Sequence, residues 1–193
     1  VTGNTIVDAI FQNLEEIESS ETLEKLGLHP KKYFVATIHR QENVDNKERF
    51  SRILNTLKKI SKEFNRTILY PIHPRSKKRM KIFGLTSSEI RLIHPLGFTS
   101  FLQLEKNAEL VLTDSGGVQE ETCILKVPCV TLRDNTERPE TLDIGSNILA
   151  GTEQENIIRC TEMMLSRDND WKNPFGDGKA GKRIVEILMD KFD

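Results

Sequence analysis

The sequence has little cysteine, few aromatic residues and almost no net charge, and each shortage excludes a class of protein. Its 193 residues include three cysteines, too few and too scattered for a disulfide framework or a cysteine-based zinc site. No stretch approaches the roughly 18 consecutive apolar residues of a membrane helix. We therefore expect a cytoplasmic protein without a membrane span, a secretion signal, a metal or a cofactor.

The charge balance argues against nucleic acid as a partner. Lys and Arg number 28 against 29 Asp and Glu, so no overall positive field attracts DNA, RNA or an anionic membrane. The basic run 75–81 has no interleaved aromatic residues on which bases could stack. We interpret it as a solvated helix face.

Short apolar runs alternate with longer amphipathic stretches. We expect strands at residues 33–39, 67–73, 90–96, 110–114, 128–132 and 147–150. We expect helices at residues 47–64, 77–83, 101–107, 117–125, 139–144 and 153–165. This alternation predicts an α/β fold built from βαβ units, a doubly wound, Rossmann-like parallel sheet. The run 34–38 is apolar on both faces, which is typical of strands covered by helices on both sides.

The two ends lie outside this alternation. An apolar face spaced for one helix precedes the first strand, formed by Ile6, Ala9, Ile10, Asn13, Leu14 and Ile17. We interpret residues 1–19 as a connector helix from a further domain, since residue 1 is Val rather than Met. A turn-rich segment at 173–178 precedes a closing helix predicted at 179–192.

The residues typical of a ligand site directly follow predicted strands. Ligands of open parallel sheets bind beyond the carboxyl ends of the strands. The segments at those positions are His39-Arg40-Gln41-Glu42-Asn43, His73-Pro74-Arg75, Asp114-Ser115-Gly116-Gly117 and residues 133–139. Their histidines, arginines, serine and glycines predict a site for an anion that carries hydroxyl groups.

The segment Ser115-Gly116-Gly117 has the pattern of a phosphate loop. Two glycines let a phosphate approach the backbone where a helix begins, and the free N–H groups and the helix dipole favour negative charge. Glu121 follows Gly117 by four residues and lies on the same helix face, where a carboxylate can accept hydrogen bonds from a ribose diol. The alternative is a simple tight turn, with Glu121 as a solvated helix residue.

The histidines His39 and His73 allow several interpretations. They could bind a phosphate, transfer protons or hydrogen-bond to neighbouring loops, but no third ligand has a recognisable metal spacing. Arg40 and Glu42 beside His39 favour a functional role.

Four motifs occur together in a fixed order, at residues 39–43, 113–121, 136–140 and 173–178. As a set they closely resemble the UDP-N-acetylglucosamine 2-epimerase family of the non-hydrolysing type. The resemblance covers the whole chain but only the C-terminal half of a family member. Members have two Rossmann-like domains that face each other across a cleft, a glycosyltransferase-B-type architecture. The resemblance thus implies that residues 1–193 are the C-terminal, UDP-binding domain, without the N-terminal domain.

The resemblance also implies roles for individual residues. Ser115, Gly116 and Gly117 match the diphosphate-binding loop, and Arg138 matches an arginine that contacts the substrate. His39 matches a histidine that reaches the phosphates and the sugar, and is a candidate catalytic residue.

Further contacts are implied for the nucleoside. Glu121 matches the ribose-binding carboxylate, while Leu96 and Phe101 fall where the family holds the uracil. An allosteric site near the cleft is implied to be lined by Arg40, Glu42 and His73.

The implied reaction interconverts UDP-N-acetylglucosamine and UDP-N-acetylmannosamine, for cell-surface polysaccharide synthesis, by eliminating and re-adding UDP. The main acid and base groups belong to the N-terminal domain, so we expect this chain alone to bind UDP without catalysis. The implied reaction involves no oxidation, so no cofactor is expected. The resemblance also implies that the full-length protein forms a homodimer. Two alternatives stay open: a hydrolysing 2-epimerase that releases N-acetylmannosamine and UDP, and a nucleotide-sugar glycosyltransferase domain.

Overall fold

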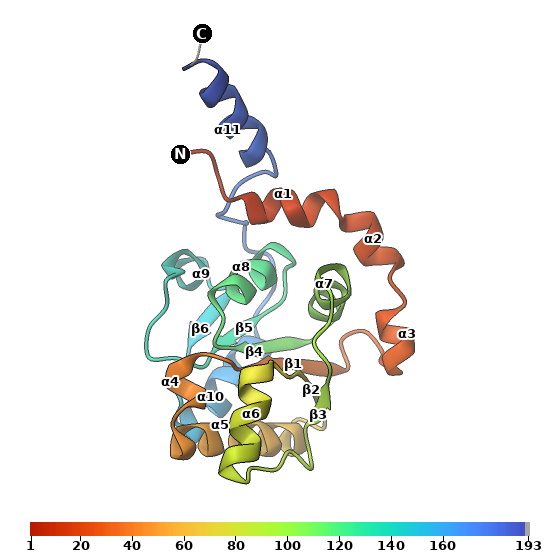
Figure 1. The fold of residues 1–193 in the computed structure, drawn as a ribbon, viewed down its shortest axis with the longest axis vertical. Coiled ribbons are helices and arrows are strands. Elements are labelled where there is room, and N and C mark those ends of the chain that lie inside the picture. The colour runs from red at the N-terminus through yellow and green to blue at the C-terminus, as the bar shows by residue number, and fades with distance from the viewer. Residues whose placement is uncertain (192–193) are drawn as a thin grey trace.

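Six parallel strands form the centre of the structure, in the order β3-β2-β1-β4-β5-β6 (Figure 1). The computed structural model describes residues 1–191. The strands are β1 (Tyr33–Thr37), β2 (Thr67–Pro71), β3 (Arg91–Ile93), β4 (Leu110–Thr113), β5 (Cys129–Thr131) and β6 (Asn147–Leu149). The strand order reverses between β1 and β4, the topological switch point of a doubly wound sheet. The predicted Rossmann-like α/β fold is confirmed.

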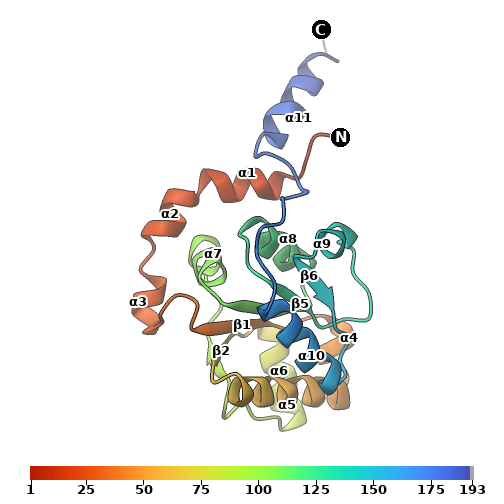
Figure 2. The same cartoon turned by 180° about the vertical axis from the view of Figure 1, so that it is seen from behind.

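Helices cover both faces of the sheet (Figures 1 and 2). One face carries α5 (Lys47–Glu63), α6 (Pro74–Phe83) and α10 (Gln154–Leu165). The other carries α7 (Phe98–Lys106), α8 (Gly116–Ile124) and α9 (Pro139–Asp143), with α1 (Thr5–Gln12), α2 (Leu14–Ser19) and α3 (Thr22–Leu26) outside them. A short helix, α4 (Gln41–Val44), follows β1, and α11 (Ala180–Met189) projects beside the N-terminus. Within residues 1–191, no helix has the length and apolar character needed to cross a bilayer.

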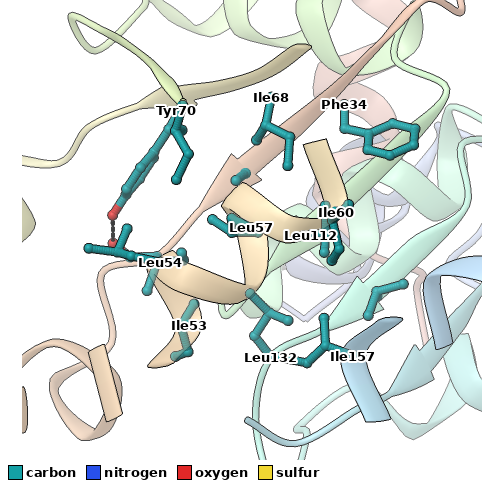
Figure 3. Close-up of a cluster of buried hydrophobic side chains, with 14 of the residues drawn as sticks. Phe34, Ile53, Leu54, Leu57, Ile60, Ile68, Tyr70, Leu112, Leu132 and Ile157 are labelled. Carbon is teal, nitrogen blue, oxygen red and sulfur yellow. Dashed lines mark hydrogen bonds between the residues drawn. The ribbon is translucent and has the colours of Figure 1, made fainter. Parts of the chain in front are cut away.

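Successive residues of β1 pack into two different cores, because the side chains of a strand alternate between the faces of the sheet. Phe34 and Ala36 belong to the cluster that also contains residues of α5 and α10. Tyr33 and Val35 belong to the cluster on the opposite face, with Leu104 of α7. Figure 3 shows the first cluster, in which side chains of α5 lie against those of the strands. This two-sided burial explains why the predicted strands were apolar without alternation.

The opening segment differs from the single helix that was predicted. Asn13 ends α1: its backbone N–H donates a hydrogen bond to the Ile10 carbonyl oxygen, and its side-chain Nδ2 donates one to the Ala9 carbonyl oxygen at 2.8 Å. The helix α2 begins at the next residue. Both helices pack on the domain, since Val7, Ile10 and Ile17 are fully buried in a cluster with residues of α7 and α8. The periodicity predicted the apolar face but not the break, which depends on these local hydrogen bonds.

Other boundaries also differ from the predictions. The strands are shorter than predicted at their carboxyl ends, where the site loops begin. The helices α3 and α4 were missed because segments of five and four residues are too short to show a helical period. The closing helix α11 ends at Met189, and position 192 of its predicted range lies outside the described residues.

Replacing Leu57 tests the packing of α5 on the sheet. Leu57 has no exposed surface, so Leu57→Ala is expected to lower the free energy of unfolding by about 2–5 kcal/mol through lost burial and a residual cavity. Urea unfolding followed by circular dichroism measures the change. The exposed Lys59 on the same helix is the control, and Lys59→Ala is expected to cost less than about 0.5 kcal/mol. Equal losses in both variants would contradict the assigned packing.

Candidate functional site

A cavity of about 200 Å³ opens at the carboxyl edge of the sheet, beside the switch point between β1 and β4. Its lining includes five of the residues singled out in the sequence: His39, His73, Leu96, Phe101 and Ser115. They come from segments far apart in the chain, after β1, β2, β3 and β4. The sheet topology therefore brings these predicted residues together, as the rule for open parallel sheets requires.

Ser115 prepares the start of α8 for an anion. It is the N-cap residue, and its Oγ accepts a hydrogen bond from the N–H of Val118 at 3.4 Å, which leaves the hydroxyl hydrogen free to donate. Gly116 and Gly117 are the first two residues of the helix, so their N–H groups have no intrahelical acceptor. The hydroxyl, these N–H groups and the helix dipole together favour bound negative charge.

The folded chain itself does not require glycine at these two positions. Neither Gly116 nor Gly117 has a positive φ, and a Cβ added to them would come no closer than 3.7 Å and 3.9 Å to a neighbouring atom. Gly178 is a contrast, because it has φ +79° and a Cβ there would lie 2.7 Å from the Phe11 ring. Open space over a bare backbone favours the ligand interpretation of the glycine pair over a simple tight turn.

Asp114 joins the loop after β1 to the end of β4. Its carboxylate is completely buried and accepts hydrogen bonds from the backbone N–H groups of His39 and Arg40, at 2.9–3.0 Å, and from Asn43 Nδ2 at 3.0 Å. The Nδ1 atom of His39 lies 3.3 Å from the same carboxylate. The sequence did not lead us to predict this role for Asp114, although an aspartate directly between a buried strand and a glycine pair is a usable signal.

Burial is the largest influence on His39 and lowers the pKa of its imidazole, although the Asp114 carboxylate opposes this. The ring is therefore neutral at neutral pH. Its Nδ1 faces the Asp114 carboxylate, and a proton on that atom would leave Nε2 as an acceptor. The His73 ring lies beside it, with 5.5 Å between the two ring centroids.

Arg133 organises a set of ion pairs next to the glycine pair. Its side chain is almost buried, and it donates from Nε to Glu42 Oε1 at 2.8 Å and from Nη1 to Glu137 Oε2 at 2.5 Å. Glu137 accepts a further hydrogen bond from Arg40 Nη2 at 2.7 Å. Arg40 and Glu42 are thus tied into this network and do not line the cavity around His39. The sequence predicted a loop that contains Arg133 and Glu137, but it did not predict their ion pairs.

Arg138 lies apart from the His39 cavity. Its Nε is 2.5 Å from Glu120 Oε1, and the same oxygen accepts a hydrogen bond from Asn4 Nδ2 at 2.8 Å. Arg138 and Glu120 line a separate hollow of about 400 Å³ that the N-terminal segment and Phe175 complete. Two of the sequence motifs, 136–140 and 173–178, therefore meet in space.

Glu121 is not the solvated helix residue of the alternative interpretation. It is partly buried on α8, and its nearest interacting carboxyl group is that of Glu105 on α7, which has no exposed surface. Burial raises the pKa of Glu121 to about 7 and the pKa of Glu105 well above its ordinary value. A buried Glu105 was not predicted from the sequence, since a lone Glu in an amphipathic helix normally faces solvent. Among residues 1–191, no group of three or more His, Cys, Asp or Glu side chains is placed to hold a metal ion.

A family model and the curated relatives of this chain point to the same family. The family model for UDP-N-acetylglucosamine 2-epimerase matches residues 1–189. The UDP-N-acetylglucosamine 2-epimerase of Methanocaldococcus jannaschii is 53% identical over 97% of this chain and 54% of its own length. The Bacillus subtilis protein of the same name is 37% identical over 98% of this chain and 51% of its own. The chain spans about half the length of the curated relatives it matches.

The fold of this chain is also similar to solved structures of UDP-GlcNAc 2-epimerases. A crystal structure of the M. jannaschii UDP-GlcNAc 2-epimerase in complex with UDP-GlcNAc and UDP has a TM-score of 0.92, and the match covers 98% of this chain and 54% of that one. The Neisseria meningitidis enzyme bound to UDP-GlcNAc has a TM-score of 0.86 at 30% identity, with 98% and 55% covered.

The carboxyl pair predicts a pH dependence of stability. Because the pKa of Glu121 rises from 4.5 unfolded to about 7 folded, the folded protein holds protons that the unfolded chain releases in this range. The pair's contribution is therefore greatest below pH 4.5 and is lost as the pH rises towards 7, by about 1.4 kcal/mol per pH unit for each proton retained.

The double variant Glu105→Gln/Glu121→Gln carries no proton-binding group at this place. Urea unfolding at several pH values between about 5 and 7 is expected to show a wild-type stability that declines relative to the double variant. A difference that stays constant with pH would contradict the assigned protonation.

Proposed function

Because this chain belongs to the UDP-N-acetylglucosamine 2-epimerase family, we propose that it is the UDP-binding domain of an enzyme that interconverts UDP-N-acetylglucosamine and UDP-N-acetylmannosamine. The observation that carries the proposal is the start of α8. Gly116 and Gly117 leave bare, uncrowded backbone at a helix N-terminus, beside a cavity at the switch point of the sheet. A nucleoside diphosphate fits this arrangement, because its diphosphate would bind at the helix N-terminus and its nucleoside would occupy the cavity.

The diphosphate would bind to the Ser115 hydroxyl and to the N–H groups of Gly116 and Gly117. Arg40 Nη2 and Glu137 Oε2 both lie 3.7 Å from an added Cβ at Gly116. The Arg40 guanidinium, which also neutralises the Glu137 carboxylate, would contribute positive charge to the same anion. If UDP is the leaving group, negative charge grows on the diphosphate as the bond to the sugar breaks. Donors already aimed at that position stabilise the transition state without reorganisation.

The remaining contacts follow from the cavity and its neighbours. Leu96 and Phe101 line the cavity and would hold the uracil, and Glu121, one helical turn after Gly117, would accept from the ribose diol. His39 lines the same cavity and would reach the phosphates and the sugar. Arg138 would meet the substrate from the neighbouring hollow that it lines.

We further propose that the chain is the C-terminal domain of a longer, two-domain protein, with residues 1–19 leading in from the N-terminal domain. The half-length coverage of the relatives supports this organisation. The helix α11 adds an independent argument, because it exposes a continuous apolar face. The exposed residues of that face are Ile184, Val185, Ile187, Leu188 and Met189. We propose that this face packs against the N-terminal domain, which would supply the main acid and base groups.

The names of the relatives favour an epimerase over a glycosyltransferase. Whether the sugar leaves as a UDP-linked or a free N-acetylmannosamine is decided by product analysis of the full-length protein. Allosteric roles for Arg40, Glu42 and His73 remain a prediction, as does a homodimer of the full-length protein. A cytoplasmic location is also proposed, and the three buried cysteines, all free thiols, fit a reducing compartment.

Ligand-dependent thermal stability tests UDP binding directly. UDP at about ten times its Kd is expected to stabilise the chain by about 1.4 kcal/mol, whereas free N-acetylglucosamine is expected to have no effect because the diphosphate and ribose contacts dominate. Differential scanning fluorimetry measures both. No shift in Tm at millimolar UDP would refute the proposed binding site.

Replacing Gly117 separates the needs of the ligand from those of the fold. A methyl group at Gly117 meets only the Ser115 Oγ at 3.9 Å, so Gly117→Ala is expected to keep or slightly raise the stability, by up to about 1 kcal/mol. The methyl group would occupy the path of the phosphate, so we expect the affinity for UDP to fall at least about tenfold, or about 1.4 kcal/mol. Isothermal titration calorimetry measures the affinity.

Gly181 is the matched control, since it is the second residue of α11 as Gly117 is of α8. A Cβ there would lie 3.3 Å from Asp8 Oδ1, away from the cavity. The variant Gly181→Ala is expected to bind UDP like the wild type. Unchanged affinity in Gly117→Ala would remove the main support for the proposal.

A further inference from the structure

A pair of carboxyl groups lies one helical turn below the proposed nucleotide site, between α7 and α8. Phe101 lines the cavity from the first turn of α7, and Glu105 follows it by four residues on the same helix face. Gly117 begins α8, and Glu121 follows it by the same spacing. The two helices lie side by side and are in contact (Figures 1 and 2), so Glu105 and Glu121 each follow the start of the site by one helical turn on neighbouring helices.

Glu105 is an unusual residue for this place. It has no exposed surface, and in the described part of the chain no donor group reaches either of its carboxyl oxygens. A buried carboxylate without donors or a counter-charge is strongly disfavoured, so the group is protonated. The group available to it across the contact between α7 and α8 is the Glu121 carboxylate, which can only accept. A hydrogen bond between the two must therefore use the carboxylic acid proton of Glu105, since two ionised carboxylates offer no hydrogen to share.

The proton belongs to Glu105 rather than to Glu121. Glu105 has no exposed surface whereas Glu121 is partly exposed, so burial disfavours the charged form more strongly at Glu105. Glu121 is partly exposed and keeps a second carboxylate oxygen for another donor. A donor fixed on one oxygen also fixes the rotamer of the carboxylate.

We propose that Glu105 is a positioning residue that donates a hydrogen bond from its protonated carboxyl group to Glu121 and thereby orients the Glu121 carboxylate towards the ribose hydroxyls of the bound nucleotide. This inference rests on the proposed function, because it assigns the ribose to Glu121. Glu105 itself has no access to the ligand and acts only through Glu121.

Titration of the 193-residue chain with UDP and with 2′-deoxy-UDP isolates this role. The two ligands differ only at the 2′-hydroxyl, so the ratio of their Kd values reports the hydrogen bonds of that hydroxyl group. For the wild type we expect a preference for UDP of about tenfold or more, the usual loss for a hydrogen bond to a charged group. In Glu105→Leu we expect the preference to shrink to within about threefold of unity.

Two variants distinguish positioning from a merely structural role. Glu105→Gln keeps a donor, the side-chain amide, and is expected to retain most of the preference for UDP. Gln103→Leu removes another buried polar side chain of α7, which bonds to the backbone at Ser20 and Thr22 away from α8. It is expected to lower the Tm but to leave the ratio unchanged, whereas Glu105→Leu changes the ratio without a loss of Tm, because an apolar residue replaces a buried acid.

The pH dependence of this ratio of Kd values is a second test of the positioning role. Both ligands carry the same diphosphate, so its titration cancels. The preference of the wild type is expected to grow as the pH rises through about 7, as Glu121 ionises, and in Glu105→Leu this midpoint is expected to move upward. The other titratable groups near the pair are Glu120, which is paired with Arg138, and the buried thiol of Cys129.

The outcomes are distinguishable. An unchanged ratio in Glu105→Leu, with UDP still bound, overturns the positioning role and leaves the proposed function intact. A wild-type ratio near one overturns the assignment of the ribose to Glu121, and with it this inference. Absence of UDP binding by the wild type refutes the proposed function itself.

Discussion

The buried carboxylate of Asp114 is the contact on which the arrangement of the site depends. Asp114 directly follows β4 at the switch point. Its carboxylate accepts hydrogen bonds from the backbone N–H groups of His39 and Arg40 and from the side-chain amide of Asn43. These hydrogen bonds hold the loop after β1 against the loop that begins α8. Without them, each of these buried or half-buried donors would need another acceptor, at a cost of about 1–3 kcal/mol for each unsatisfied group. One side chain thus fixes the distance between the imidazole of His39 and the helix N-terminus.

Charge around the proposed phosphate site is arranged in advance. Arg133 is almost buried between Glu42 and Glu137, and Glu137 in turn holds Arg40 above Gly116. Arg133 is the buried member and holds Glu137, and the more exposed Arg40 guanidinium is positioned by its hydrogen bond to that carboxylate. An arginine held in place loses less side-chain entropy when it meets an anion, which is the physical benefit of preorganisation.

Burial also sets the protonation of the groups that surround the site. Burial lowers the pKa of His39 and raises the pKa values of Glu105 and Glu121, so the buried histidine and the buried Glu105 are both uncharged at neutral pH. The start of α8 would meet the proposed diphosphate with hydrogen-bond donors and a helix dipole rather than with a formal charge of its own. Such donors remain effective where water is excluded, because the local dielectric is low.

Much of this was determined by the sequence alone. The alternation of apolar runs with amphipathic stretches predicted the doubly wound sheet, because both periods reflect local backbone geometry, and the residues after the strand ends predicted which side chains share one edge. The pairings of Asp114 with His39, of Arg133 with Glu137 and of Glu105 with Glu121 were decided only by the tertiary structure. Each joins residues that no local pattern relates, and burial of a polar side chain depends on what the rest of the chain packs around it. The sequence could therefore place the loops, while their hydrogen-bond partners and protonation states required the folded arrangement.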